Sequence, residues 1–214
     1  MRLRLHTRCQ NSAGQRVRIV LNLKGVAYEY VAIPSLRNDA FRELSPHGLM
    51  PVLEVDGHAV VQSLAIVELL EELFPEPSVL PVEPIARAEA RAFANAIACD
   101  LHPLNNHRVR RYLAEELSAD EHETIAWYRH WIARSFAGLE ASLARRPQEH
   151  RFCFASQPTM ADAFLVPQMD NARRFDRDLS PYPRLCAKDA ACRKLDAFIA
   201  AAPETQPDYP DGSR

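Results

Sequence analysis

Apolar and polar residues follow two different patterns along this chain. Up to about residue 75, short stretches with the two-residue period of a β-strand alternate with stretches of helical spacing. Beyond residue 75 only the helical spacing persists. Two of the strand-like stretches are joined by Asp56-Gly57, which is a strong signal for a tight β-hairpin. The predicted order of elements is therefore β-α-β-α-β-β-α. The strands span 2–6, 28–33, 51–55 and 58–62, and the helices span 12–24, 38–44 and 63–74.

Prolines separate the two patterns. Residues 74–84, FPEPSVLPVEP, contain four prolines, a density that stops helices and favours an extended linker. The polar, proline-rich end of the chain, PETQPDYPDGSR, is expected to be loosely ordered. Helices are predicted at 85–116, 120–145, 160–175 and 188–201. We therefore predict an α/β domain over 1–78, a linker over 79–84 and an all-α domain over 85–214.

Composition narrows the class of protein. The 214 residues carry a formal charge of -2 with mixed signs throughout, so neither nucleic acid nor an anionic membrane is an expected partner. The N-terminus, MRLRLHTR, is too polar for a signal peptide, and no apolar stretch approaches the roughly 18 residues that cross a bilayer. Scattered cysteines without CxxC spacing favour a reduced, cytoplasmic chain, and we expect no metal site. The cysteines are Cys9, Cys99, Cys153, Cys186 and Cys192.

The first predicted helix begins in a polar stretch, Asn11-Ser-Ala-Gly14. Asn11 or Ser12 is suited to cap the helix by accepting a hydrogen bond from a backbone N–H of the first turn. Gly25 stands where the helix would end in a left-handed cap. The polar residues could simply cap the helix, hold an anion or supply a hydroxyl for chemistry. The functional alternatives require other polar groups near the same helix N-terminus.

Two further stretches supply candidate polar groups. In SPHGLMPVLEV, Pro51 directly precedes a predicted strand and favours an extended conformation at Met50. In VVQSLAIVELLEE, Ser63 lies at a junction between a strand and a helix. A serine there caps the helix, and the free N–H groups and positive dipole of the same helix end bind carboxylates or phosphates.

Several segments carry a family resemblance that covers nearly the whole chain. RVRIVLNLKGVAYEYVAI, MPVLEVDG, QSLAIVELLEE, CDLHPLNN and QPTMADAFLVPQ resemble the cytosolic glutathione transferases of the zeta class, whose members include maleylacetoacetate and maleylpyruvate isomerases. DLHPLNNHR, NARRF and AAPETQP resemble the bacterial isomerases. The resemblance implies the cytosolic glutathione transferase fold, with a thioredoxin-like βαβαββα domain and an all-helical C-terminal domain. It also implies a homodimer that uses glutathione as its cofactor.

The resemblance assigns roles around glutathione to six residues: Met50, Pro51, Gln62, Ser63, His102 and Asn106. Pro51 would be a cis-proline that lets the backbone of Met50 pair with the cysteinyl part of glutathione. Gln62 and Ser63 would hold the γ-glutamyl carboxylate at a helix N-terminus. His102 and Asn106, four apart on one helix, would face the thiol and the substrate. Without its family context, His102 is more typical of a helix surface than of a binding site.

The implied reaction is cis-trans isomerisation of a maleyl double bond in aromatic catabolism. The thiolate of glutathione adds to one alkene carbon, the resulting single bond rotates, and elimination restores the alkene and the thiol. The protein must favour the thiolate through hydrogen-bond donors, because a free thiol has a pKa of about 8.5. A small dicarboxylate substrate also requires arginines, and Arg108 and Arg174 match the arginines of the bacterial isomerases. We interpret Arg110, Arg111 and Arg173 as solvated surface charges.

The polar stretch departs from the family pattern, which usually has R-S-S-C-S or R-S-G-T-S before the Arg-Val-Arg segment. Here Gln10 replaces the arginine that would grip substrate, and Asn11 replaces the serine that activates glutathione. An asparagine amide can also donate a hydrogen bond to a thiolate, so Asn11 and Ser12 are the catalytic candidates. Arg8, two residues from Gln10 on the same side of the strand, could substitute for the lost arginine.

Three other functions remain open. The protein could be a transferase or dehalogenase that conjugates glutathione to small electrophiles. It could be a thiol transferase that uses Cys9, although a cysteine in an apolar strand is usually unreactive. It could also bind glutathione without catalysis, as the changes at Gln10 and Asn11 would allow.

Two other patterns indicate structure alone. Thr159 and Asp162 have the spacing of a capping box, and we expect them to begin a helix. Trp127 and Trp131 are four apart, a spacing typical of helix packing. We assign neither pair to the active site.

Overall fold

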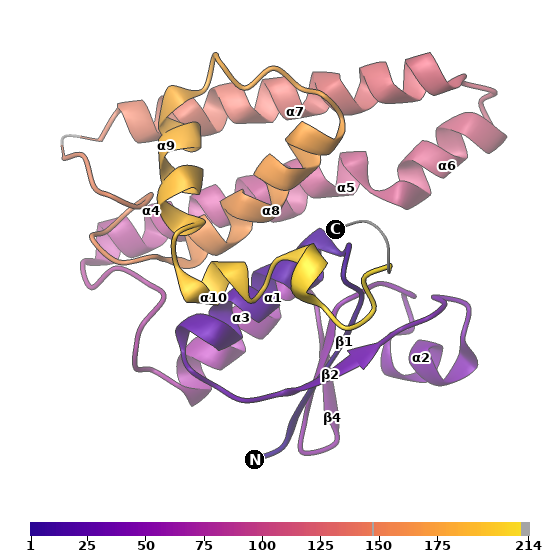
Figure 1. Ribbon diagram of the computed structural model, residues 1–214, viewed down its shortest axis with the longest axis horizontal. Coiled ribbons are helices and arrows are strands. Elements are labelled where there is room, and N and C mark those ends of the chain that lie inside the picture. Colours follow the sequence, from indigo (N-terminus) through magenta and orange to yellow (C-terminus); the bar gives the residue numbers. More distant parts are fainter. Residues whose placement is uncertain (147, 211–214) are drawn as a thin grey trace. The chain divides into compact units, whose positions relative to one another are not determined.

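The structure is a computed structural model that describes residues 1–146 and 148–210. The chain forms two compact units (Figure 1). The first contains residues 1–80 and the segment from Arg193 onward, and the second contains Pro81–Cys192. No helix within the described residues is both long enough and apolar enough to cross a membrane.

The first unit is built on a mixed four-stranded sheet. The strands are β1 (Leu3–Thr7), β2 (Glu29–Ala32), β3 (Val52–Val55) and β4 (His58–Val61), in the order β2-β1-β3-β4. β1 runs parallel to β2 and antiparallel to β3, which pairs with β4 as a hairpin. Asp56 and Gly57 have φ angles of 47° and 88°, as a tight hairpin turn requires. The hairpin predicted from these two residues is confirmed.

Helices cover both faces of this sheet. Leu5 and Leu53 pair across β1 and β3 and are fully buried on one face. On the opposite face, Val52 packs with Phe41 of α2 (Asp39–Leu44). α1 (Ser12–Leu23) and α3 (Ser63–Leu73) pack against each other on the side away from α2 (Figure 1). This is the thioredoxin-like arrangement expected for the N-terminal domain.

α1 is buried on several sides. Val17, Ile19, Val20 and Leu21 are fully buried, whereas Leu23 is half-buried. The additional cover is α10 (Asp196–Ile199), which contacts α1. Asn22 of α1 donates a hydrogen bond to the carbonyl of Ala197 at 3.0 Å. Gly25 has a φ of 64°, which confirms the left-handed cap after α1.

The end of the chain is therefore part of the first unit. The prediction that residues 85–214 form the helical domain does not hold for residues 193–210, which belong to the first unit. The prediction that residues 203–210 are loosely ordered is also wrong. After the short η2 (Pro203–Thr205), Gln206 is buried and donates to the carbonyls of Ala200 and Ala202, both at 2.9 Å. Residues 211–214 lie outside the described residues.

The second unit consists of helices. They are α4 (Pro84–Asn95), the π-helical η1 (Ala96–Leu101), α5 (His102–Asn105), α6 (His107–Glu115), α7 (Glu121–Ala144), α8 (Met160–Arg174) and α9 (Pro183–Cys192). The single helix predicted over 85–116 is wrong. Pro103 has no N–H to donate to the residue four before it, and a wider π-turn precedes it. The helix predicted over 188–201 is likewise two helices, because α9 ends at Cys192 and α10 starts at Asp196.

The predicted capping box at the start of α8 is confirmed. The Asp162 carboxylate is fully buried and accepts from the backbone N–H of Thr159 at 2.8 Å and from its hydroxyl at 3.0 Å. The second carboxylate oxygen accepts from the N–H of Cys153 at 2.9 Å. The box thus also fixes the loop that leads into α8.

A buried ion pair joins the ends of α1 and α3. The ammonium of Lys24 donates to the Glu71 carboxylate at 2.7 Å and to the carbonyls of Phe74 at 2.6 Å and Pro77 at 3.0 Å. The Lys24 side chain has no exposed surface. Glu71 also accepts from the N–H of Val79 at 3.1 Å, so the pair fastens the proline-rich segment to both helices.

We predict that Lys24→Met lowers the free energy of unfolding by about 3 kcal/mol at neutral pH, because it leaves a partly buried carboxylate without its cation. Burial alone would raise the pKa of Glu71, but hydrogen bonds from Lys24 and Ser78 lower it below its ordinary value of 4.5. A carboxyl group whose pKa is lowered by folding stabilises the folded state at pH values above its ordinary pKa. This stabilisation is lost as the pH falls through the pKa of the group in the folded state.

Urea unfolding at several pH values measures this effect, with the exposed Lys194→Met as the matched control. The stability difference between wild type and Lys24→Met should shrink as the pH falls below 4.5. A difference that stays constant down to the acid transition would contradict the proposed role of the pair.

Candidate active site

Two helices of the first unit begin next to each other with polar residues. α1 starts at Ser12 after β1, α3 starts at Ser63 after β4, and the two helices pack together. Arg16 of α1 is 1% exposed and donates to the Ser63 hydroxyl at 3.2 Å. A buried cation therefore lies beside the free N–H groups of a helix N-terminus, which is a favourable place for an anion. No motif in the sequence distinguishes Arg16 from the other arginines of the chain.

Asn11 is the N-cap of α1. Its side-chain oxygen accepts from the backbone N–H of Gly14 at 2.5 Å, and the Thr7 hydroxyl donates to the same oxygen at 3.5 Å. A Cβ atom at position 14 would collide with the Thr7 hydroxyl, so this close approach requires glycine. Because the oxygen faces the helix, the amide nitrogen of Asn11 is directed away from it and can donate to a ligand.

The junction between β4 and α3 has an unusual backbone. Gln62 has a φ of 72° although it is not glycine. It is the residue directly before Ser63, where α3 begins. Such a conformation costs about 1–3 kcal/mol and is concentrated at ligand-binding sites. Gln62 is exposed, whereas Ser63 is 6% exposed. This supports the prediction that the two residues bind a ligand carboxylate at the start of α3.

The Met50-Pro51 peptide bond is cis, as the family resemblance implied. Met50 is half-buried against the cluster around Phe41, and the strand pairing of β3 begins at Val52. The backbone of Met50 therefore lies beyond the paired part of the sheet. This position is compatible with its predicted role in pairing with the backbone of a peptide ligand.

Two candidate residues of the second unit are arranged differently from the prediction. His102 is the first residue of α5, whereas Asn106 lies after that helix and caps α6. The Asn106 side chain accepts from the N–H of Arg108 at 3.1 Å, and its extended backbone interrupts the helix. The expectation that both residues lie four apart on one helix is therefore wrong. Their contact with glutathione remains a prediction.

The arginines of the second unit fall into two groups. Arg108 and Arg174 are exposed, as substrate-binding side chains would need to be. Arg110 instead lies over the stacked rings of Tyr128 and Phe175, at 5.3 and 5.0 Å from their centroids. The interpretation of Arg110 as a solvated charge is wrong, because aromatic faces attract its guanidinium. Its contact with Phe175 joins the segments that carry Arg108 and Arg174.

The two other surface arginines also differ from each other. Arg173 pairs with the buried carboxylate of Asp189 and lies 3.7 Å from Asp170, so it is a structural cation. Arg111 lies 3.6 Å from Glu115 on an exposed helix face, as expected of a surface charge.

Burial also affects the tyrosine beneath Arg110. It raises the pKa of Tyr128 to about 12, while the charges of Arg110 and Arg174 act in the opposite direction. Arg174 therefore lies within electrostatic range of this aromatic pair. Tyr128 stays a neutral phenol at physiological pH.

Arg8 and Gln10 do not form the arrangement that the strand pattern suggested. Arg8 lies one residue past the end of β1, and its guanidinium donates to the carbonyls of Ile33 and Pro34. Gln10 is exposed. The structure thus gives Arg8 a role in holding the loop after β2, and a substrate contact by either residue remains a prediction.

Comparisons with known proteins decide the family. A family model described as "Glutathione S-transferase, N-terminal domain" matches residues 8–78. The maleylpyruvate isomerase of Ralstonia sp is 45% identical over 210 residues, which are 96% of this chain and 99% of that protein. The holo structure of a maleyl pyruvate isomerase, described as a bacterial glutathione S-transferase in the zeta class, has a TM-score of 0.94. It is 44% identical and covers 97% of this chain and 100% of its own. The chain belongs to the zeta class of glutathione S-transferases.

Another solved zeta-class relative supports the same assignment. A maleylacetoacetate isomerase from Anaeromyxobacter dehalogenans 2CP-1, with bound GSH in its active site, is 42% identical with a TM-score of 0.87. The similarity covers 98% of each chain. The predicted transferase fold is confirmed.

In this zeta-class transferase, Cys9 has the environment of an unreactive thiol. It is 7% exposed, and its thiol donates to the carbonyl of Asp208 at 3.5 Å. Burial, followed by the nearby charge of Asp208, raises the pKa of the Cys9 thiol. Both effects disfavour the thiolate that a thiol transferase would need.

We predict that Cys9 of the native transferase reacts with iodoacetamide at least about tenfold more slowly than the exposed Cys99, because burial and a raised pKa both reduce its reactivity. Peptide mass spectrometry of samples taken during the reaction would measure both rates. Unfolded protein is the control, in which the two rates should converge. Equal rates in the native protein would restore the hypothesis of a thiol transferase.

Proposed function

We propose that this protein is a glutathione-dependent cis-trans isomerase that converts a maleyl substrate, maleylpyruvate or maleylacetoacetate, to its fumaryl product in cytoplasmic aromatic catabolism. Its full-length similarity to isomerases of both substrates carries the proposal. The probable maleylacetoacetate isomerase of Vibrio cholerae, for example, is 42% identical and covers 97% of this chain. The geometry of the two helix N-termini supports it.

Glutathione is anionic at its γ-glutamyl end, and the start of α3 fits that charge. The free N–H groups at the N-terminus of α3 and the Ser63 hydroxyl can donate to a carboxylate. Arg16 adds a buried positive charge 3.2 Å from that hydroxyl. Gln62 and the backbone of Met50 complete the proposed binding surface within this unit.

Bound glutathione supplies the thiolate that adds to the alkene and leaves again after rotation. The protein must stabilise that thiolate, and donors aimed at the sulfur lower the pKa of a thiol. Asn11 can supply an amide N–H, because its oxygen is already held by Gly14 and Thr7. Ser12 and the N-terminus of α1 act in the same direction.

The substrate carries two carboxylates, and the remaining candidates would bind them. Arg108 and Arg174 offer exposed guanidinium groups, and each can grip a carboxylate through two hydrogen bonds. His102 and Asn106 are proposed to contribute polar contacts to glutathione. Gln10 and Arg8 complete the substrate-binding proposal, with Gln10 able to donate only neutral hydrogen bonds.

One observation favours a second candidate function. Gln10 is neutral and exposed where zeta-class sequences usually have arginine, so the site has less positive charge for a dianion. A glutathione transferase or dehalogenase acting on small electrophiles would not need that charge. Turnover of halogenated acids without turnover of maleyl substrates would favour this alternative, and glutathione binding without any turnover would indicate a non-catalytic protein.

Isomerisation of maleylpyruvate and maleylacetoacetate, followed by the loss of enol absorbance with and without glutathione, tests the proposal. We predict glutathione-dependent turnover, and a decrease in kcat of at least about tenfold in Asn11→Ala, because a donor to the thiolate is lost. Asn11→Ser, which replaces the amide by a hydroxyl donor, should retain most of the activity.

Asn38→Ala is the matched control, because Asn38 caps α2 through the N–H of Phe41 at 3.1 Å. Both alanine variants should lose about 1 kcal/mol of stability through the missing cap, but only the variant at Asn11 should lose turnover. Equal activities of the two variants would show that Asn11 is a cap and nothing more.

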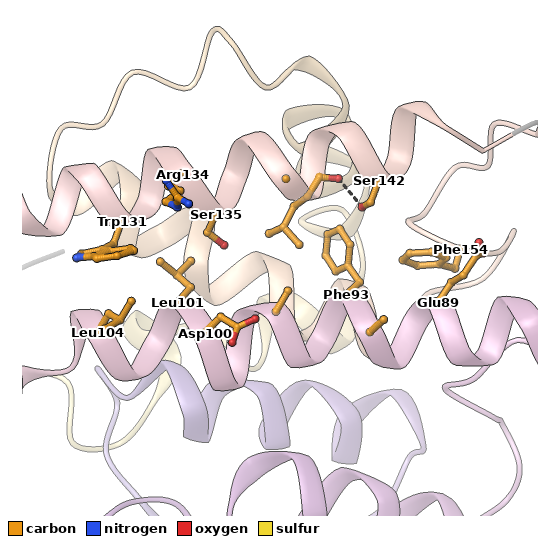
Figure 2. Close-up of a pocket in the computed structure, with 14 residues that line it drawn as sticks. Glu89, Phe93, Asp100, Leu101, Leu104, Trp131, Arg134, Ser135, Ser142 and Phe154 are labelled. Atoms are coloured by element: carbon orange, nitrogen blue, oxygen red, sulfur yellow. Dashed lines mark hydrogen bonds between the residues drawn. The ribbon is translucent and has the colours of Figure 1, made fainter.

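We also propose that the protein is a homodimer. In the second unit, a pocket of about 460 Å³ opens between α4 with η1 and the facing side of α7 (Figure 2). Figure 2 shows side chains that point toward it from both helical segments, including Phe93, Leu101 and Trp131. A largely apolar surface hollow of this kind is typical of an interaction site.

We predict that Ala96→Arg, which places a long charged side chain in this pocket, shifts the protein from dimer to monomer in sedimentation equilibrium, because the side chain fills the hollow and its charge is costly to remove from water. Ala126→Arg on an exposed part of α7 outside the pocket lining is the control and should remain dimeric. A wild-type protein that sediments as a monomer would refute the dimer proposal without affecting the isomerase proposal.

A further inference from the structure

The last described residues of the chain reach the loop that ends at the catalytic candidate Asn11. Residues 196–210, which we call the C-terminal strap, belong to the same compact unit as α1. Figure 1 shows the strap in yellow, with α10 beside α1. The loop consists of residues 8–11, which connect β1 to α1 and end at Asn11.

Asp208 of the strap accepts three hydrogen bonds, two from Cys9 of this loop and one from Tyr30 of β2. One carboxylate oxygen accepts from the backbone N–H of Cys9 at 3.1 Å. The other accepts from the phenol of Tyr30, in β2, at 2.6 Å. The carbonyl of Asp208 accepts from the thiol of Cys9 at 3.5 Å. The carboxylate therefore links the loop to the neighbouring strand of the sheet.

Arg18 holds the same loop from the side of α1. Its guanidinium is fully buried and donates to the carbonyl of Arg8 and to that of Cys9, both at 3.1 Å. It also donates to the carbonyl of Ala201 in the strap, at 3.0 Å from Nη2 and 3.2 Å from Nε. One buried cation thus connects the loop with the strap.

These contacts occupy the backbone groups just before Asn11. The N–H of Cys9 and the carbonyls of Arg8 and Cys9 all have partners in Asp208 or Arg18. The Asn11 amide must face the sulfur of glutathione in a fixed orientation to act as a donor. A loop without these partners would leave that orientation free to vary, and small displacements of a catalytic group are costly.

We propose that Asp208 is a positioning residue for the isomerase site, and that the C-terminal strap, together with Arg18, holds the loop of residues 8–11 so that Asn11 faces the thiolate. This inference rests on the proposed function. It assigns the end of the chain a role in catalysis that its sequence, a polar and proline-rich tail, did not suggest.

If Asp208 acted only through its charge, its removal would shift the pKa of the glutathione thiol in the opposite direction from a loss of positioning. A negative charge near the site disfavours a thiolate, so its removal alone would lower the pKa of the glutathione thiol. Loss of positioning weakens the donor to the sulfur and raises that pKa. The direction of the change therefore separates the two effects.

The test uses the full-length protein with Asp208→Ala, Asp208→Asn and the control Glu204→Ala, which removes an exposed carboxylate from the same strap. The ultraviolet absorbance of bound thiolate as a function of pH gives the pKa of the glutathione thiol. Isomerase kinetics and thermal unfolding accompany each titration. Asparagine keeps an acceptor for Cys9 and a polar partner for Tyr30, so it should restore the positioning without the charge.

For Asp208→Ala we expect the pKa of the bound thiol to rise by about one unit, which at pH values well below that pKa lowers the thiolate fraction and kcat about tenfold. The KM for glutathione should change by less than about threefold, because α3 supplies the main anion-binding groups. Asp208→Asn, which keeps the positioning and loses only the charge, should have a thiol pKa equal to or slightly below that of wild type. Glu204→Ala should match wild type in every measurement.

Two results would overturn the proposal. An unchanged thiol pKa and kcat in Asp208→Ala would make the strap purely structural, even with a lower Tm. A lowered thiol pKa in both Asp208 variants would indicate a charge effect.

Tyr30→Phe removes one partner of Asp208 and should raise the thiol pKa by a smaller amount than Asp208→Ala does. This variant keeps the test decisive if Asp208→Ala does not fold. A wild type that binds glutathione without isomerase activity would refute the proposed function, whereas the thiol titrations would still test the positioning.

Discussion

The buried guanidinium of Arg18 is the interaction on which the arrangement of the first unit depends. A cation removed from water must have its N–H groups matched by acceptors. The chain meets this requirement with backbone carbonyls from the loop before α1 and from Ala201 near the end of the chain. Because neither segment alone satisfies the cation, the strap and the loop must fold together.

A second buried arginine lies at the start of α3. Arg16 is buried against Ser63, so a positive charge and a helix N-terminus act on one place in the first unit. Such an arrangement is prepared for an anion before any ligand arrives, which reduces the reorganisation that binding requires. The unusual backbone of Gln62 is consistent with a junction shaped by binding and not by helix formation alone.

In the proposed mechanism, Asn11 serves both structure and chemistry. Its oxygen caps α1 and its nitrogen faces the other way, so the capping bond fixes the orientation of the donor. A serine at this position can cap and donate only through one oxygen atom, whereas an amide separates the two tasks. The replacement of serine by asparagine is therefore compatible with thiolate activation, although the loss of arginine at Gln10 reduces the charge available to the substrate.

The sequence by itself determined the features that depend on neighbouring residues. Asp56-Gly57 determined the hairpin, the Thr159 and Asp162 spacing determined a capping box, and the family motifs indicated the fold. These predictions succeeded because turns and caps are set by a few residues that are close in the chain.

Only the tertiary structure decided the partners of the arginines. Arg18 binds the carbonyl of Ala201, 183 residues away, Arg8 binds carbonyls after β2, and Arg110 lies on two aromatic rings. Every residue carries a carbonyl, so a guanidinium that binds carbonyls leaves no pattern in the sequence that would reveal its partner. For the same reason the part of the strap after residue 202 resembled a loose tail. The order of the strap depends on contacts with β2, α1 and the loop between β1 and α1, and not on its own composition.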